Sequence, residues 1–322
     1  MYASLSIDLD NQWSYQKTHG DAGWEDYPSY LDVIVPRVLG LLEKLEIDAT
    51  FFIVGKDAEL AKNRDAMRRI GDSGHEVANH SFSHDPKLAG FPDDELLQEV
   101  AKAEHWIEER TGFRPVGFRA PGFSHCPALM QILSERGYLY DASTFPTFIG
   151  PLARMYHFAT SGLSKEEKRK QKHLYGGWSE AFRSLKAHPL NLEGEKQLLE
   201  IPVTTMPGLR TPIHATYLLY LACLSPLAAR AYLRSALTLC KLTRTPPSFL
   251  LHPTDFLGCD DTPQLLFFPA MGQISQWKMK QMTHFLKMVK DGFETITMRE
   301  HAKREGVFDK FASDNLETAH VL

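Results

Sequence analysis

Short β-rich runs alternate with amphipathic helical patterns along most of this 322-residue chain. This alternation constrains the fold more than any other feature, because strands joined by crossover helices run parallel to one another. Such strands form either a barrel or a doubly wound sheet, with the helices outside. The candidate strands are residues 2–9, 48–54, 75–79, 115–119, 138–143, 199–205, 248–252 and 293–297.

Two segments interrupt this rhythm. Residues 147–198 contain the charged run SKEEKRKQKH, which favours a solvated helix. Residues 212–245 are apolar at first and basic further on, and two interpretations stay open. They form a helical pair packed on the barrel, or an interfacial element that reaches a membrane or a lipid-linked substrate. Without a repeat or a clear linker, we expect a single domain over residues 1–322 with these two insertions.

Composition excludes several classes of protein. A net charge of −4 gives no reason to expect nucleic acid as a partner. The four cysteines are scattered without a CxxC pair, so reduced thiols in a cytosolic setting are expected. The first residues run directly into a strand rather than a signal peptide, and no apolar run approaches the roughly 18 residues of a membrane span. We expect a soluble, cytoplasmic protein, with peripheral contact to the inner membrane face through 212–245 as the sharper alternative.

Polar side chains gather where the candidate strands end. In parallel α/β folds the carboxyl ends of the strands meet at one rim, and active sites lie at that rim. Each residue has an ordinary explanation by itself, such as a turn or a helix cap, but their shared position predicts a site. The residues are Asp8, Asp10, His80, His84, Arg119, Asp141, Ser143 and His252.

The segment NHSFSHD suggests metal chemistry. His80 and His84 are separated by three residues, which places both side chains on one face if the segment is a helical turn, or in a looser loop. Two imidazoles and one carboxylate form a three-ligand site that leaves positions open for water or substrate. Because the chain lacks an HExxH glutamate, a thermolysin-like protease is disfavoured and the base must come from elsewhere. Asp8 is available for that role.

Five ordered segments between residues 4 and 255 resemble the polysaccharide deacetylases of the NodB-homology type, carbohydrate esterase family 4. The segments are SIDLD, HSFSH, FRAPG, YDASTFP and FLLHP. The resemblance implies a distorted (β/α) barrel of about seven parallel strands, here with helical insertions. It also implies hydrolysis of an N-acyl group on a sugar.

The same resemblance implies a role for each residue. Asp8 takes the position of the catalytic base and Arg119 orients it, while His252 takes the position of the general acid. Asp10, His80 and His84 take the metal positions, with Zn²⁺ expected and Co²⁺, Ni²⁺ or Mn²⁺ as alternatives. The substrate-binding positions correspond to Pro121, Asp141, Ser143 and Leu250.

Three departures from the family pattern bear on the substrate. Leu9 separates the two aspartates that are adjacent in many members, and FRAPG and YDASTFP lack the aromatic residues that line a polysaccharide groove. We therefore expect an N-acylated, most simply N-acetylated, sugar or glycolipid in glycan, lipopolysaccharide or glycolipid biosynthesis. Two alternatives remain: an allantoinase-like hydrolase of small amides or cyclic imides, and a catalytically inactive carbohydrate-binding relative.

Overall fold

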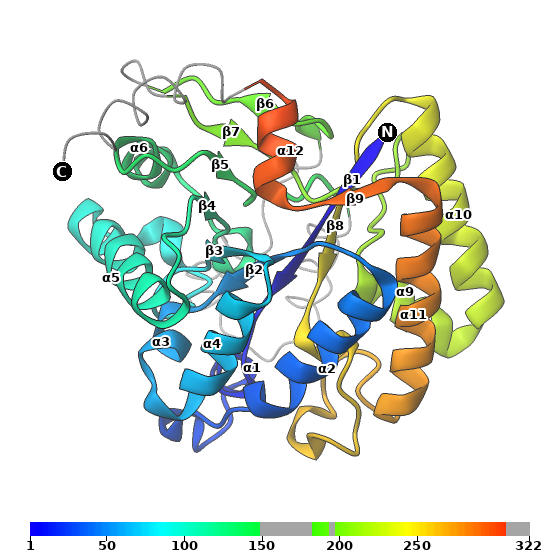
Figure 1. Ribbon diagram of the computed structural model, residues 1–322, viewed down its shortest axis with the longest axis horizontal. Helices are drawn as coiled ribbons and strands as arrows, with labels where there is room; N and C mark the ends of the chain where they lie inside the picture. The colour runs from blue at the N-terminus through cyan, green and yellow to red at the C-terminus, as the bar shows by residue number, and fades with distance from the viewer. Residues whose placement is uncertain (149–181, 193–196, 307–322) are drawn as a thin grey trace, which may run out of the picture.

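The computed structural model describes residues 1–148, 182–192 and 197–306, and shows one curved sheet surrounded by helices (Figure 1). The strands are β1 (Tyr2–Asp8), β2 (Thr50–Ile53), β3 (Glu76–Asn79), β4 (Gly117–Phe118), β5 (Tyr140–Asp141), β6 (His188–Pro189), β7 (Leu199–Glu200), β8 (Ser248–Leu251) and β9 (Glu294–Ile296). The helices are α1 (Gln12–His19), α2 (Leu31–Leu45), α3 (Gly55–Glu59), α4 (Arg64–Asp72), α5 (Asp93–Thr111), α6 (Pro127–Glu135), α9 (Ala215–Leu224), α10 (Pro226–Leu242), α11 (Ser275–Gly292) and α12 (Met298–Arg304). Short 3₁₀ turns are η1 (Trp24–Asp26), η2 (Ala61–Asn63), η3 (Leu88–Gly90), η4 (Pro121–Phe123), η6 (Pro253–Asp255) and η7 (Pro263–Leu265).

The sheet curls into a distorted barrel, as predicted. Its strand order is β6-β7-β5-β4-β3-β2-β1-β8, and β9 pairs with the beginning of β1. Among the described residues every pairing between two of these strands is parallel except that of the short strand β6, which no pattern had predicted. Beyond β7, the Thr204 amide donates to the Ser248 carbonyl oxygen (3.0 Å), and the Ser248 amide donates to Thr204 Oγ1 (2.7 Å). These two bonds connect the far end of the sheet to β8.

Strand β1 shows why the chain folds around its sheet. Its odd-numbered residues Ala3, Leu5 and Ile7 are buried in the main hydrophobic cluster between the sheet and the outer helices. Its even-numbered residues are polar, and because side chains alternate along a strand they point into the barrel. A strand covered on both faces is typical of parallel sheets.

Helix α12 closes the amino-terminal end of the barrel. Its Met298 and Ala302 pack against the inward residues Phe52 and Tyr140. The imidazole of His301 forms a 2.8 Å hydrogen bond with the Ser4 hydroxyl near the start of β1. The carboxyl ends of the parallel strands lie at the opposite end of the barrel.

The two insertions differ in what can be described. Residues 212–245 contain α9 and α10, which contact each other and α11, so the interpretation as a helical pair packed on the barrel is confirmed. Most of 147–198 lies outside the described residues, and the single-domain assignment stays a prediction. No helix in the described part of the chain has the length and apolar character needed to cross a bilayer.

Candidate active site

The side chains expected at the rim occur there because the strand ends bring them together. Asp8 is the last residue of β1, and His80 follows β3 directly. Arg119 follows β4, and His252 follows β8. Because all four strands are parallel, these ends lie at the same end of the barrel.

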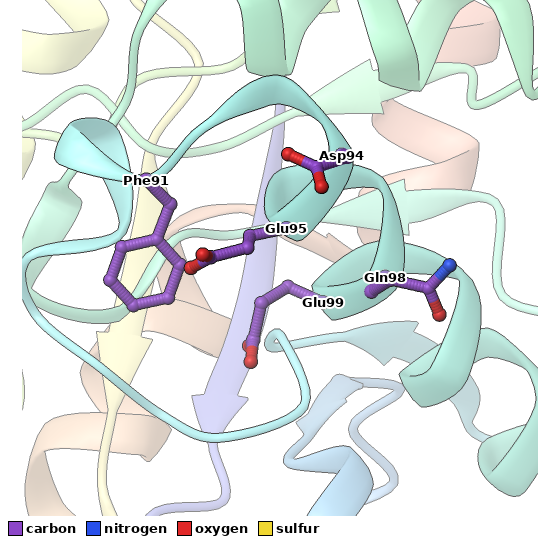
Figure 2. A pocket seen from close by; sticks show the side chains of 5 residues that line it. All are labelled: Phe91, Asp94, Glu95, Gln98 and Glu99. Atoms are coloured by element: carbon purple, nitrogen blue, oxygen red, sulfur yellow. The ribbon is translucent and has the colours of Figure 1, made fainter.

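The segment between His80 and His84 is a loop rather than a helical turn. Ser81 and His84 have φ values of 59° and 49°, in the left-handed region that non-glycine residues adopt rarely. The Glu99 carboxylate on α5 accepts hydrogen bonds from the Phe82 and Ser83 amides (3.0 and 2.9 Å) and so holds the loop in place. Glu99 also belongs to a small pocket at the start of α5, lined by Phe91, Asp94, Glu95, Gln98 and Glu99 (Figure 2).

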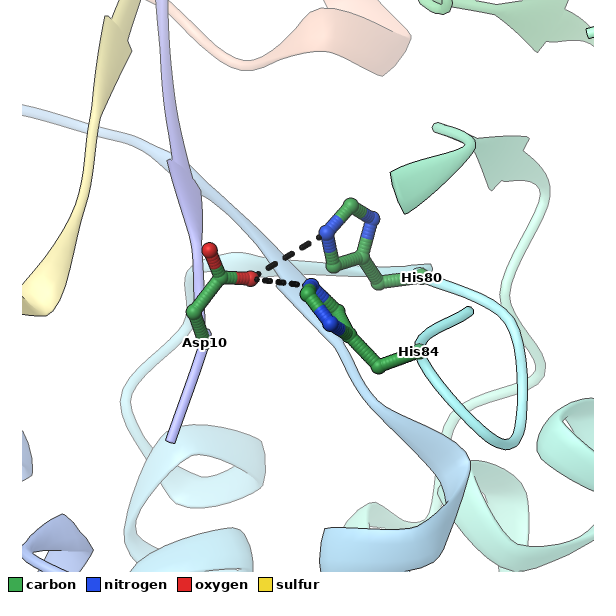
Figure 3. A group of neighbouring side chains, drawn as sticks. All are labelled: Asp10, His80 and His84. Carbon is green, nitrogen blue, oxygen red and sulfur yellow. Dashed lines mark hydrogen bonds and ion pairs between the residues drawn. The ribbon is translucent and has the colours of Figure 1, made fainter. Parts of the chain in front are cut away.

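Asp10, His80 and His84 form a compact cluster. The Nε2 atoms of His80 and His84 lie 3.2 and 2.9 Å from the same oxygen of Asp10, and both rings point at that oxygen (Figure 3). One potential ligand atom from each residue falls within 4.8 Å of the others. Burial raises the pKa of Asp10, but the adjacent His84 and His80 outweigh it and hold that pKa well below its ordinary value. Burial lowers the pKa of His80, whereas the charges of Asp8 and Asp10 raise it above its ordinary value.

The donors of this cluster suit a divalent cation. The Nδ1 of His80 lies 2.7 Å from the Arg119 carbonyl oxygen, which can only accept, so Nδ1 carries the proton. In the neutral form of His80 the lone pair of Nε2 therefore faces the Asp10 carboxylate, and this position suits either a proton or a divalent cation. Two imidazoles and one carboxylate are ligands that zinc accepts, and tetrahedral bonds of about 2.0–2.1 Å place ligand atoms roughly 3.3 Å apart. The two His–Asp separations, 3.2 and 2.9 Å, are close to that value.

A second buried carboxylate fixes the segment that follows Asp10. Asp57 Oδ1 accepts hydrogen bonds from the Asn11 amide (2.7 Å) and the Trp13 indole (3.0 Å). The Trp13 ring also packs edge-on against His84. Burial raises the pKa of Asp57 to about 6. The hydrogen bonds of Asp57 therefore hold Asn11, which follows Asp10, and Trp13, which contacts His84.

Asp8 is held by Arg119. The guanidinium Nη1 of Arg119 lies 2.6 Å from Asp8 Oδ1, donates to the Ser6 hydroxyl (2.9 Å), and is completely buried. Its Nε donates to the Ala142 carbonyl oxygen (3.0 Å), which fixes the direction of the side chain. A charge-assisted hydrogen bond of this kind is short and directional, so it fixes the orientation of the carboxylate.

His252 faces the other oxygen of Asp8 and is supported from behind. Its Nε2 lies 4.0 Å from Asp8 Oδ2, and its Nδ1 lies 3.2 Å from the Thr216 hydroxyl. That hydroxyl donates to Asp255 Oδ1 (2.7 Å), so it accepts the proton of His252 Nδ1. This arrangement directs Nε2 toward Asp8 and supplies a negative charge behind the imidazole.

The four residues expected to bind substrate are buried. Asp141 and Ser143 are inaccessible to solvent, and the Ser143 hydroxyl donates to Asp141 (2.7 Å) while accepting from the Ala120 amide (2.8 Å). These two side chains therefore stabilise the strand ends beside Arg119, and neither is open to a substrate in this conformation. Pro121 is also buried, and Leu250 is 1% exposed at the register position opposite Ser6.

Three residues of the site had no signal in the sequence pattern. Thr216 and Asp255 support His252, and His214 lies beside it, with ring centroids 6.3 Å apart. Burial and the charge of His252 lower the pKa of His214 to about 3, so this imidazole is neutral at ordinary pH. Its ring also packs against Phe145, which in turn packs against Phe123. Phe123 directly follows FRAPG and Phe145 lies within YDASTFP, and they were the available hint of these ring contacts.

Together the barrel and this cluster define a (β/α)-barrel protein with a candidate metal-assisted acid–base site. Residues 21–140 match the family model described as polysaccharide deacetylase. The chain is therefore related to that family across this region, and the predicted resemblance is confirmed. The match includes His80, His84 and Arg119, while Asp8, Asp10 and His252 lie outside it.

Curated relatives and a solved structure agree with this relationship. The chain is 32% identical over 107 residues to peptidoglycan-N-acetylglucosamine deacetylase of Bacillus cereus, covering 33% of this chain and 37% of that protein. It is 32% identical over 134 residues to peptidoglycan deacetylase of Helicobacter pylori, covering 38% and 44%. The matches thus span less than half the length of either relative. A Mycobacterium smegmatis structure assigned as a polysaccharide deacetylase matches with a TM-score of 0.59 at 18% identity, over 94% of this chain and 91% of that one, which shows the shared fold.

Proposed function

We propose that this protein is a metal-dependent hydrolase that removes an N-acyl group, most simply N-acetyl, from a sugar. The observation that carries the proposal is the position of Asp8. Its two oxygens face Arg119 and His252, and the cluster of Asp10, His80 and His84 lies beside it. A base, an acid and a cation site at one barrel end are what amide hydrolysis requires.

The residues divide the reaction between them. A divalent cation, when bound, polarises the amide carbonyl and acidifies water. Asp8 accepts the proton of the attacking water, and the hydrogen bond from Arg119 aims this carboxylate. His252 delivers a proton to the leaving nitrogen, because an amide nitrogen leaves poorly as an anion. Asp255 supports the charged imidazole through Thr216.

The substrate class and the location belong to the same proposal. The Bacillus cereus relative is named as a deacetylase of peptidoglycan N-acetylglucosamine and the Helicobacter pylori relative as a peptidoglycan deacetylase, which supports an N-acetylated sugar. FRAPG has no aromatic residue between its proline and glycine, and YDASTFP has no tryptophan; these two departures favour a nucleotide- or lipid-linked sugar of glycan, lipopolysaccharide or glycolipid biosynthesis over a long polymer. The four cysteines are free thiols in the structure, which supports a cytoplasmic location.

Elemental analysis combined with an acetate-release screen tests this function. We expect about one Zn²⁺ per chain as isolated, loss of acetate release after chelation, and recovery with Zn²⁺, Co²⁺, Ni²⁺ or Mn²⁺. The screen uses nucleotide-linked and lipid-linked N-acetylhexosamines, N-acetylglucosamine oligomers, and small cyclic amides as the comparison class. Turnover of the cyclic amides alone would replace the sugar assignment, and a chain that binds no metal and turns over nothing would be an inactive relative.

A further inference from the structure

Asp57, in helix α3, is a completely buried carboxylate without a role in the proposed reaction. Its Oδ1 accepts three hydrogen bonds, from the Asn11 amide (2.7 Å), the Trp13 indole (3.0 Å) and the Asn63 amide (3.1 Å). All three donors are uncharged groups. They orient the carboxylate, but they do not neutralise it.

The lysines near Asp57 in the sequence are engaged elsewhere. Lys56 forms an ion pair with Glu59 (2.6 Å), and Lys62 donates to the Asp26 carbonyl oxygen (3.1 Å). A buried charge is costly unless a counter-charge or a metal ion compensates it. The burial of Asp57 therefore points to a positive charge that these lysines do not supply.

A divalent cation held by Asp10, His80 and His84 would supply this charge. Imidazoles bind a metal as neutral groups, and Asp10 offsets one of the two charges, so one positive charge is left over. The nearby Asp8 does not offset it, because its carboxylate is already paired with a guanidinium. The single negative charge of Asp57 matches this remainder.

In the described part of the chain, His84 and Asp57 each keep one buried polar atom without a hydrogen-bond partner. These atoms are His84 Nδ1 and Asp57 Oδ2. The other histidine differs, because His80 Nδ1 has the Arg119 carbonyl oxygen as its acceptor (2.7 Å). A metal-bound imidazole usually donates the proton of its other nitrogen to a carboxylate, a carbonyl oxygen or water. His84 Nδ1 is thus a donor in need of an acceptor, and Asp57 Oδ2 is an acceptor in need of a donor.

Three observations place Asp57 near His84. Two amides at the start of α3 donate to carbonyl oxygens of the loop between His80 and His84 (2.9 Å each), so α3 lies against this loop. The Trp13 indole, which donates to Asp57, packs edge-on against the His84 ring with centroids 6.4 Å apart. Burial raises the pKa of Asp57 to about 6, whereas its hydrogen bonds and the charge of His84 lower it, so the imidazole is close enough for its charge to act.

We propose that Asp57 is a positioning residue of the metal site, which stabilises the His84 imidazole with its proton on Nδ1 and so leaves Nε2 free to bind the cation. The two unpartnered atoms are not hydrogen-bonded to each other, and one buried water between them would satisfy both. The inference rests on the metal site of the proposed function, but it does not depend on the substrate.

Zinc affinity of the full chain tests this role, measured by competition with a chromophoric chelator at about pH 8, where Asp57 is ionised. Asp57→Asn keeps one oxygen for the three donors, while its amide nitrogen replaces Oδ2 and cannot accept a hydrogen bond. We expect the Kd for Zn²⁺ to rise about 10- to 100-fold. Thermal unfolding of the metal-free variant checks that it is folded.

Asn63→Ala is the matched control. It removes one donor to Oδ1 but leaves the charge and the Oδ2 atom of Asp57, so it should bind Zn²⁺ like the wild type. A second measurement needs no variant: the Zn²⁺-loaded wild type should show a slowly exchanging Nδ1 proton on His84 by NMR. A His84 proton that exchanges as fast as that of free imidazole contradicts the proposal, even if Asp57→Asn does not fold.

The outcomes separate this inference from the proposed reaction. No loss of Zn²⁺ affinity in Asp57→Asn, or an equal loss in Asn63→Ala, overturns the positioning role. A wild type that binds no Zn²⁺ removes the metal site, and the inference with it. A wild type that binds Zn²⁺ but releases no acetate contradicts the reaction alone, and the comparison of the two variants still decides the role of Asp57.

Discussion

At the scale of single residues, the spacing of the first motif has a geometric meaning. Residues 8 and 10 share the inward side of an extended segment, whereas Leu9 between them is 2% exposed and belongs to the outer core. Both carboxylates therefore point into the barrel, one toward Arg119 and the other toward His80 and His84. Because Asp8 and Asp10 are two residues apart in an extended segment, one can act as the candidate base while the other acts as a candidate metal ligand.

Asp8→Asn tests the base. We expect kcat for acetate release to fall by about 10²- to 10⁴-fold, because the amide accepts no proton from water. Elemental analysis provides the control, since Asp10, His80 and His84 are intact and the metal content should be unchanged. Undiminished turnover with full metal content would show that the base lies elsewhere.

Thr216→Val tests the support behind His252. Removing the hydroxyl breaks the hydrogen-bonded link between His252 Nδ1 and Asp255 Oδ1 and leaves the 4.0 Å approach of Nδ1 to Asp255 Oδ2, so we expect kcat to fall about 10- to 100-fold with little change in KM. Thr216→Ser keeps the hydroxyl and should retain most of the activity. Equal losses in the two variants would indicate a packing defect rather than a positioning role.

At the scale of elements, close helix packing supports the half of the barrel that carries the histidines. Helix α4 approaches the end of α5 so closely that a Cβ on Gly71 would lie 2.3 Å from the Thr111 carbonyl oxygen. Helix α5 in turn carries Glu99, which holds the loop between His80 and His84. A displacement of α5 would therefore move the loop between His80 and His84.

Gly71→Ala should destabilise the protein for this reason. We expect the free energy of unfolding to fall by about 1–3 kcal/mol, measured by urea denaturation, because the backbone of α5 must move. Gly40→Ala is the matched control inside α2, where a Cβ meets nothing within 4 Å. It should raise the stability by about 0.5–1 kcal/mol, as alanine does in an exposed helix position. Equal effects of the two substitutions would contradict the close approach.

At the scale of the whole molecule, α12 connects the end of the chain to its beginning. His301 is 1% exposed, and its Nδ1 is hydrogen-bonded to Ser4 in β1. Burial and the nearby Arg304 lower the pKa of His301 to about 3. The closure at the amino end therefore depends on a neutral imidazole.

This makes the fold sensitive to acid. The pKa of a histidine in the unfolded chain is about 6.5, so between that pH and about 3 the unfolded state binds a proton that the folded state does not. We expect His301 to reduce the free energy of unfolding by about 1.4 kcal/mol per pH unit as the pH falls through this range. His301→Asn should show a smaller slope in urea denaturation between about pH 6 and 4.5. A slope equal to that of the wild type would mean that His301 is protonated in the folded chain.

The amino-acid sequence by itself determined the barrel and most of the site. Strand periodicity and the order of the strands place Asp8, His80, Arg119 and His252 at one end, because the carboxyl ends of parallel strands converge whatever the loops do. The strands in the structure are shorter than the predicted ranges, because the last residues of the β-rich sequence runs lie beyond the point where the backbone leaves the sheet.

Only the tertiary structure decided which further side chains reach these residues. His214 caps α9 and Thr216 lies in its first turn, and no local pattern records that this helix packs beside β8. Asp141 and Ser143 carry the polar chemistry of a binding site, yet long-range hydrogen bonding buries them. The sequence could place residues along strands, but contacts between elements distant in the chain depend on how the whole molecule packs.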